Sequence, residues 1–141
     1  MAQFNTKNQS STVARRWFTD IDINMNLHPE SKDVVLKYDL NAIKRSLRNI
    51  LQTNHYERPF HPEIGSSVRS LLFENINPIT TNILKRAIGE VITNFEPRAR
   101  LSAIDCFPDI DRNGYEVTIH FYIVNMPGEQ VQLETFLERA R

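Results

Sequence analysis

The segment 77–98 constrains the fold of this chain most strongly, because it predicts both a long helix and the point where that helix must stop. Asn77 is a good N-cap, and Pro78 suits the first helical position. Pro97 disfavours helical geometry at the residue before it. The apolar side chains between these points form one stripe at helical spacing: Ile79, Ile83, Ala87, Ile88, Val91, Ile92 and Phe95. The sequence therefore predicts an amphipathic helix over 77–95 that ends at a Glu96-Pro97-Arg98 corner.

A second helix is predicted over 40–53, with Asp39 as its N-cap. One face of this helix is apolar, with Ile43, Leu47, Ile50 and Leu51. The basic residues Lys44, Arg45 and Arg48 fall elsewhere on the helix, where we expect a solvated face.

Residues 54–65 separate these two regions and contain two prolines and a glycine, which break regular structure and impose a fixed loop shape. We expect Phe60 and Ile64 to pin this loop to the core. Ser66 is expected to cap a short third helix that carries Val68 and Leu72.

Strands dominate the rest of the chain. Residues 98–107 are predicted to form a strand, and Asn113-Gly114 is a strong reversal signal after it. Apolar side chains then alternate with polar ones over 115–123, which is typical of a half-buried strand and predicts a hairpin. The pattern over 130–137 fits a third strand, but Leu133, Phe136 and Leu137 also fit a helical face, so both structures stay open.

The N-terminal third is harder to interpret. Residues 14–23 are expected to be an extended segment on the domain surface, and 33–38 a short strand or extended arm. We therefore predict a small single α+β domain, with about three helices packed on an antiparallel sheet of two to three strands. The expected organisation is an extended or disordered arm over 1–19, a domain over 20–137 and a short tail over 138–141.

Composition argues against several classes of partner. The 17 basic residues balance the 17 acidic ones, so no overall field favours nucleic acid or an anionic membrane. A net charge near zero protects weakly against association, which suits a component of an assembly. Cys106 is the only cysteine, so no intramolecular disulfide can form, and we expect it to be a core residue. Without an apolar signal segment or membrane-spanning run in the sequence, the product is expected to stay soluble in the cell that makes it.

The candidate reactive groups give little support for an enzyme. His55, Glu57, His61 and Glu63 match no established ligand spacing, so neither a metal nor another cofactor is expected. The serines that follow Gly65 lack the glycine pattern of a nucleophile elbow. A glycosidase needs only two carboxylates, one of them with a raised pKa, and that possibility stays open.

Glu96 is a poor general acid, because Arg98 favours its ionised form if the two meet. A carboxylate at the negative end of a helix dipole needs compensation, which Arg98, Arg100 or a donor on another chain could supply. The corner is therefore either an exposed local ion pair or part of an interface.

Several short segments in one order resemble a known family. They are Asp20-Ile21-Asp22, Arg58-Pro59-Phe60-x-Pro62-Glu63-x-Gly65, Leu72-Phe73-Glu74-Asn75 and Asn94-Phe95-Glu96-Pro97-Arg98. Together they resemble the baseplate wedge, or sheath-initiator, family of contractile phage tails, and most closely its T4-like members. The family also includes the small baseplate subunit of type VI secretion systems.

The resemblance implies a structural role in the virion, assembled in the host cytoplasm, with six copies in each baseplate. It implies contacts with the tail sheath protein and the wedge core subunits, and possible contacts with tail tube or hub proteins. It places the wedge interface at Glu96, Pro97 and Arg98, and it makes Arg58, Pro59, Phe60, Pro62 and Gly65 a structural loop.

The same resemblance implies that the sheet accepts sheath strands by strand addition and so templates the first sheath ring. The sheath-facing residues are then Tyr115, Val117, Ile119, Val131 and Leu133. Because some family members are labelled as lysozymes, peptidoglycan hydrolysis by a carboxylate pair, such as Glu63 and Glu74, is the alternative function.

Overall fold

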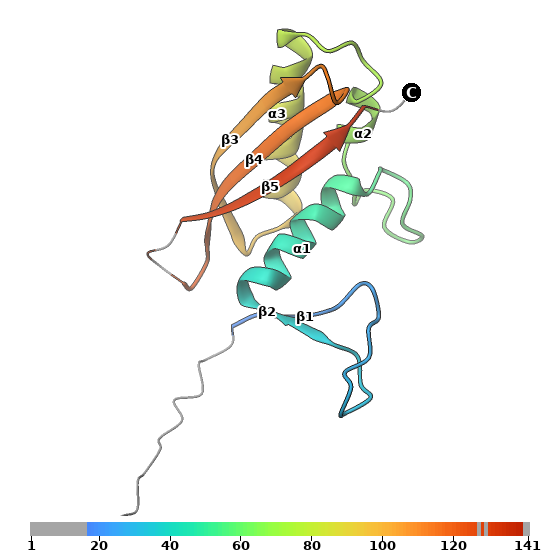
Figure 1. Ribbon diagram of the computed structural model, residues 1–141, viewed down its shortest axis with the longest axis vertical. Coiled ribbons are helices and arrows are strands. Elements are labelled where there is room, and N and C mark those ends of the chain that lie inside the picture. The colour runs from blue at the N-terminus through green and yellow to red at the C-terminus, as the bar shows by residue number, and fades with distance from the viewer. Residues whose placement is uncertain (1–16, 127, 129, 140–141) are drawn as a thin grey trace, which may run out of the picture.

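The computed structural model of the protein describes residues 17–126, 128 and 130–139. Its elements, in chain order, are β1 (Thr19–Ile21), β2 (Leu36–Tyr38), α1 (Asp39–Gln52), α2 (Val68–Leu71), α3 (Pro78–Phe95), β3 (Ala99–Asp109), β4 (Gly114–Ile123) and β5 (Gln130–Glu138). A three-stranded antiparallel sheet lies against α3, and the β1–β2 ribbon lies at the start of α1 (Figure 1). The predicted α+β class is confirmed, while the predicted arm over 1–19 lies mostly outside the described residues.

The sheet has the order β3-β4-β5, so β4 is its central strand. Ile119 of β4 lies opposite Ile104 on one side and Leu133 on the other. The predicted hairpin is confirmed, and residues 130–138 form a strand, so the helical alternative there is wrong.

The hairpin turn uses the Asn-Gly pair differently from a tight two-residue turn. Asn113 takes the left-handed conformation, with φ 51°. Gly114 is needed for a close approach, because a Cβ atom there would lie 2.5 Å from Cζ of Phe136. The reversal was therefore predictable from sequence, but the reason for the glycine was not.

Helix α3 begins and ends where the sequence predicts. The Asn77 side chain accepts a hydrogen bond from the Thr80 amide at 2.7 Å, and the last helical residue is Phe95. The predicted apolar stripe is partly wrong, since Ile79 and Ile83 are exposed. The helix is rotated so that it buries Thr80, Thr81, Leu84, Ala87, Ile88, Val91 and Ile92. Thr81 tolerates burial because its hydroxyl donates to the Asn77 carbonyl.

Two predicted helix caps have other roles. Asp39 is the first residue of α1, and its carboxylate accepts hydrogen bonds from the segment before β1. Ser66 lies ahead of α2, and its buried hydroxyl donates to the Leu51 carbonyl at 3.1 Å. Both side chains form hydrogen bonds between segments that are distant in the sequence, and no local capping pattern reveals such bonds.

The core lies between the sheet and the helices. Its fully buried side chains include Tyr115, Ile119 and Phe121 from β4, together with Ile43, Leu47, Leu84 and Ile88 from α1 and α3. Cys106 is buried as predicted, and burial raises the pKa of its thiol to about 11, which keeps it protonated and unreactive. Among the described residues, no helix combines the length and apolarity that crossing a membrane would require.

Candidate functional site

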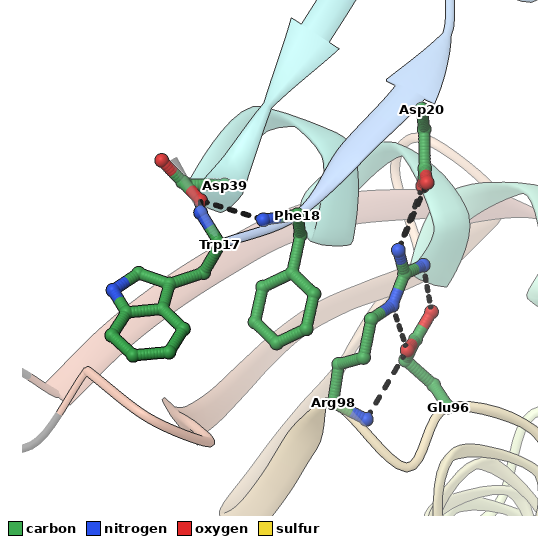
Figure 2. Close-up of polar contacts among 6 residues, drawn as sticks. All are labelled: Trp17, Phe18, Asp20, Asp39, Glu96 and Arg98. Atoms are coloured by element: carbon green, nitrogen blue, oxygen red, sulfur yellow. Dashed lines mark hydrogen bonds and ion pairs between the residues drawn. The ribbon is translucent and has the colours of Figure 1, made fainter. Parts of the chain in front are cut away.

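The Glu96-Pro97-Arg98 corner is a buried ion cluster rather than an exposed pair. Glu96 is only 2% exposed. The guanidinium of Arg98 donates two hydrogen bonds to the Glu96 carboxylate, from Nε to Oε1 at 2.7 Å and from Nη2 to Oε2 at 2.8 Å (Figure 2). The third guanidinium nitrogen, Nη1, contacts Asp20 Oδ1 at 2.9 Å. One arginine therefore joins the end of α3 to β1, which lies 78 positions earlier in the chain.

Electrostatics keep this cluster ionised. Burial by itself raises the pKa of Glu96, but the hydrogen bonds from Arg98 and Ser46 and the Arg98 charge outweigh burial and lower it. The pKa of Arg98 is raised, first by its hydrogen bonds to Glu96. The predicted compensation of Glu96 by Arg98 is therefore observed, whereas Arg100 is exposed.

A neighbouring set of contacts holds the β1–β2 ribbon against α1. Oδ1 of Asp39 accepts from the amides of Trp17 and Phe18 at 2.8 and 3.0 Å (Figure 2). Asp39 takes φ 43°, an uncommon conformation for a residue with a side chain, and these bonds hold it there. The Phe18 ring lies under the Arg98 guanidinium at 5.8 Å. The ribbon is thus attached to the corner through Asp20, Phe18 and Asp39.

Asp22 forms a second buried anchor for the ribbon. It is 2% exposed, and its Oδ1 lies 2.9 Å from Nη1 of Arg45 on α1. Lys37 Nζ is 3.9 Å from the other oxygen, and Asn26 also donates to that oxygen. Sequence reasoning assigned no role to Asp20 or Asp22, although the alternating Asp-Ile-Asp segment was itself the available signal.

The predicted structural loop over 54–65 is closed at its base and exposed at its tip. The Glu57 carboxylate accepts from the Asn54 backbone amide and side chain, both at 2.8 Å, and these bonds lower its pKa. At Gly65 any Cβ would lie 2.5 Å from backbone atoms of Asn54 and His55. Ile64 packs on the core as expected.

Phe60 does not pin this loop. It is 95% exposed, and its backbone is left-handed, with φ 71°. Among the other residues of the predicted motif, Arg58, Pro59 and Pro62 are also exposed.

The predicted sheath-facing residues lie mainly in the core. Tyr115, Val117 and Ile119 are fully buried on the central strand, and Leu133 is 1% exposed. Val131 is half-buried against the same core. In the single chain four of these side chains are buried and Val131 is half-buried, so a sheath contact at this sheet would use other atoms.

The sheet edge that remains open belongs to β5. The Arg139 amide bonds the Asn113 carbonyl on the β4 side, so alternation directs the backbone groups of even-numbered β5 residues away from β4. Consistent with this, the Arg48 guanidinium donates to the Glu134 carbonyl at 3.4 Å. The opposite edge, β3, is interrupted by a register shift between Leu101 and Ala103 and by Pro108, features that hinder strand addition.

Enzyme-like arrangements gain no support from the described residues. No cluster there contains three or more side chains that could hold a metal ion, and His61 simply contacts Glu63 at 3.1 Å. The pKa of Glu63 is lowered, first by its backbone hydrogen bond and then by His61, whereas a glycosidase acid needs a raised pKa. Both Glu63 and Glu74 are exposed.

Comparison with known proteins gives consistent relatives. Residues 37–127 match the family model described as baseplate wedge protein gp25. The chain is 35% identical over 119 residues to the baseplate wedge protein gp25 of Enterobacteria phage T4, covering 83% of this chain and 89% of that protein.

Solved structures share the fold. A chain of the anti-feeding prophage baseplate superposes with TM-score 0.69 and 25% identity, covering 78% of this chain and 88% of that one. A putative tail lysozyme from Geobacter sulfurreducens superposes with TM-score 0.60 and 22% identity, covering 70% of this chain and 91% of that one. The latter likeness extends to the fold alone.

Proposed function

Because this chain belongs to the baseplate wedge protein gp25 family, we propose that it connects the wedge core of a contractile tail to the sheath by accepting a sheath strand at β5. It is a structural component of the baseplate. The proposal also includes six copies in each baseplate and assembly in the host cytoplasm. The open outer edge of β5 is the observation that carries it.

Strand addition suits this edge for a simple physical reason. An unpaired strand presents a row of amides and carbonyls that a visiting strand can bond. On β5 these groups belong to Gln130, Gln132, Glu134, Phe136 and Glu138, by the alternation that places odd-numbered residues against β4. The proposed sheath contact therefore lies on the β5 backbone, with the buried side chains of β4 and β5 supporting it from below.

The wedge contact is proposed at the exposed side of the corner. Pro97 is exposed, Arg98 is 24% exposed and Asp20 is 36% exposed, while Glu96 lies behind them. Glu96 therefore acts by holding Arg98 and, through it, Asp20, and the partner meets the other three residues.

Gln132→Pro tests the sheath contact. Proline removes the Gln132 amide hydrogen, which points away from β4, and so leaves the β4–β5 ladder intact. We expect a folded protein that enters the wedge but fails to start the sheath, as measured by the yield of sheathed tails in electron micrographs. Gln132→Ala is the matched control, because it shortens the same side chain but keeps the amide.

Normal sheath yield with Gln132→Pro would show that β5 is not the sheath contact. Pro97→Ala tests the wedge contact, because it leaves the ion cluster untouched. We expect this variant to co-purify with wedge subunits in lower yield than the native chain does.

We also propose that the role is not enzymatic. Glu63 and Glu74 are both exposed, and the pKa of Glu63 is lowered, whereas a general acid needs a raised pKa. Clearing of a peptidoglycan suspension by the purified protein, abolished by Glu63→Gln, would instead favour hydrolysis.

A further inference from the structure

One face of α1, together with Lys37 of the adjoining ribbon, carries a concentration of positive charge that the fold neutralises only in part. A hollow of about 750 Å³ lies over this face and over part of the β1–β2 ribbon. We call it the basic hollow, and its lining is Ile23, Asn24, Lys37, Asn41, Lys44, Arg45, Arg48, Asn49 and Gln52. Four of these side chains are cationic and none is a carboxylate. In a chain with no net charge, such a surface is a local exception.

Internal partners neutralise only part of this charge. The buried carboxylate of Asp22 lies behind Arg45 and Lys37. Arg48 donates only to a carbonyl, that of Glu134. Lys44 forms no side-chain hydrogen bond or ion pair within 17–126, 128 and 130–139. Two cations, Lys44 and Arg48, therefore have no carboxylate partner in the described part of the chain.

The basic hollow continues toward the open edge of β5. Gln52 also lines a second hollow, of about 670 Å³, with Leu51, Val68, Arg69 and Leu72 on the helical side and residues 136–139, at the end of β5, on the other. The contact from Arg48 to Glu134 lies between the two hollows along α1. In Figure 1, α1 runs beside β5 and extends beyond it toward the ribbon. A strand added to β5 would therefore lie over the exposed face of α1.

The helix and strand repeats match along this contact. Lys44, Arg48 and Gln52 are four residues apart, a rise of about 6 Å per step. Two residues of a strand span about 6.7 Å and return to the same side of the sheet. The contacts follow this pairing, since Arg48 meets Glu134 and Gln52 lies with Phe136. An added strand at this spacing would place alternate residues beside Lys44 and Arg48.

We propose that the segment received at β5 is an acidic strand, with carboxylates at alternate positions that pair with Lys44 and Arg48. This inference rests on the proposed strand addition and names its partner's chemistry. Beyond Gln52 the lining combines the apolar side chains of Leu51, Val68 and Leu72 with Arg69, so apolar side chains of the same strand can pack at that end. Arg48 holds the Glu134 carbonyl until the incoming strand takes over that hydrogen bond and offers a carboxylate in its place.

Synthetic peptides test this chemistry directly. The probe is a labelled ten-residue peptide with glutamate at alternate positions, and the matched peptides carry glutamine or lysine there. Fluorescence anisotropy gives the affinity, and amide chemical shifts of the labelled protein locate the contact. We expect the glutamate peptide to bind more tightly than the glutamine and lysine peptides. Its binding should change the amide chemical shifts on the α1 face and at even-numbered residues of β5.

Removing positive charge from the protein is the second part of this experiment. Lys44→Gln/Arg48→Gln should bind the glutamate peptide about five- to thirtyfold more weakly, because two partly exposed ion pairs are lost. Arg86→Gln is the control, since it removes a cation from the exposed surface of α3 and should leave binding unchanged. Equal binding of the glutamate and glutamine peptides, or no effect of the double substitution, would overturn the acidic strand.

Failure of the inference can be told apart from failure of the proposed function. Gln132→Pro should weaken binding of the glutamate peptide if the peptide adds to β5 as a strand. Unchanged binding to Gln132→Pro, with shifts confined to α1, would reject strand addition at β5. Tighter binding of a single-stranded oligonucleotide than of the glutamate peptide would overturn the inference by making the hollow a nucleic-acid site.

Discussion

At the scale of single residues, Arg98 is the side chain whose loss the structure makes most costly. Arg98→Ala would leave the buried carboxylate of Glu96 without its ion-pair partner, which typically costs about 3–5 kcal/mol. We therefore expect a large loss of stability, measurable as the free energy of unfolding in urea.

A double substitution separates the charge from the shape. Glu96→Leu/Arg98→Met removes both charges and keeps similar volumes, so it should recover most of the stability lost in Arg98→Ala. If both variants are equally unstable, the buried unpaired charge is not the cause.

The lowered pKa of Glu96 predicts an acid-dependent part of stability. Its folded pKa lies below the ordinary value of 4.5, so its contribution is complete above that value and is lost as the pH falls through the folded pKa. Glu96→Gln should therefore be less stable than the native chain at neutral pH, with the difference narrowing below about pH 4.5. Thermal melts from pH 7 to pH 3 measure this, and a constant difference across that range would contradict it.

At the scale of elements, the sequence specified what local periodicity determines. The ends of α3 follow from Asn77, Pro78 and Pro97, and the β3–β4 hairpin follows from alternation and a reversal signal. The β1–β2 ribbon depends on Asp20 meeting Arg98, a contact across 78 positions that no local pattern encodes. Likewise, Phe60 was expected in the core because it is apolar, whereas its side chain is exposed at a position with a left-handed backbone.

Which residues of the sheet are free to contact a partner was also only partly predictable. Strand alternation alone cannot tell a central strand from an edge strand. Tyr115, Val117 and Ile119 were therefore expected at the sheath although they form the core. The basic face of α1 was visible in the sequence as a solvated face, and its position beside β5 emerged only from the fold.

The loop over 54–65 gives a prediction at the same scale. Gly65→Ala places a methyl group 2.5 Å from the backbone at Asn54 and His55, so the base of the loop must shift. We expect a loss of about 1–3 kcal/mol, the usual cost of overpacking. Gly89→Ala is the control, because its new methyl group would make ordinary contacts at 3.5 Å and alanine favours helix. Similar melting temperatures for the two variants would show that the loop base yields freely.

At the scale of the whole molecule, an open strand edge combines with a net charge of zero. Charge repulsion between copies is then weak, and the β5 backbone is available to a second copy in the absence of the proposed sheath strand. We expect the isolated protein to self-associate near its sequence pI of 6.9, as a rise in sedimentation coefficient with concentration. Gln132→Pro should suppress this rise and Gln132→Ala should not, because only proline removes an outward amide from β5. Equal association of both variants would place the self-contact elsewhere, and the exposed apolar residues of the β1–β2 ribbon, Ile21 and Leu36, would then be the next surface to substitute.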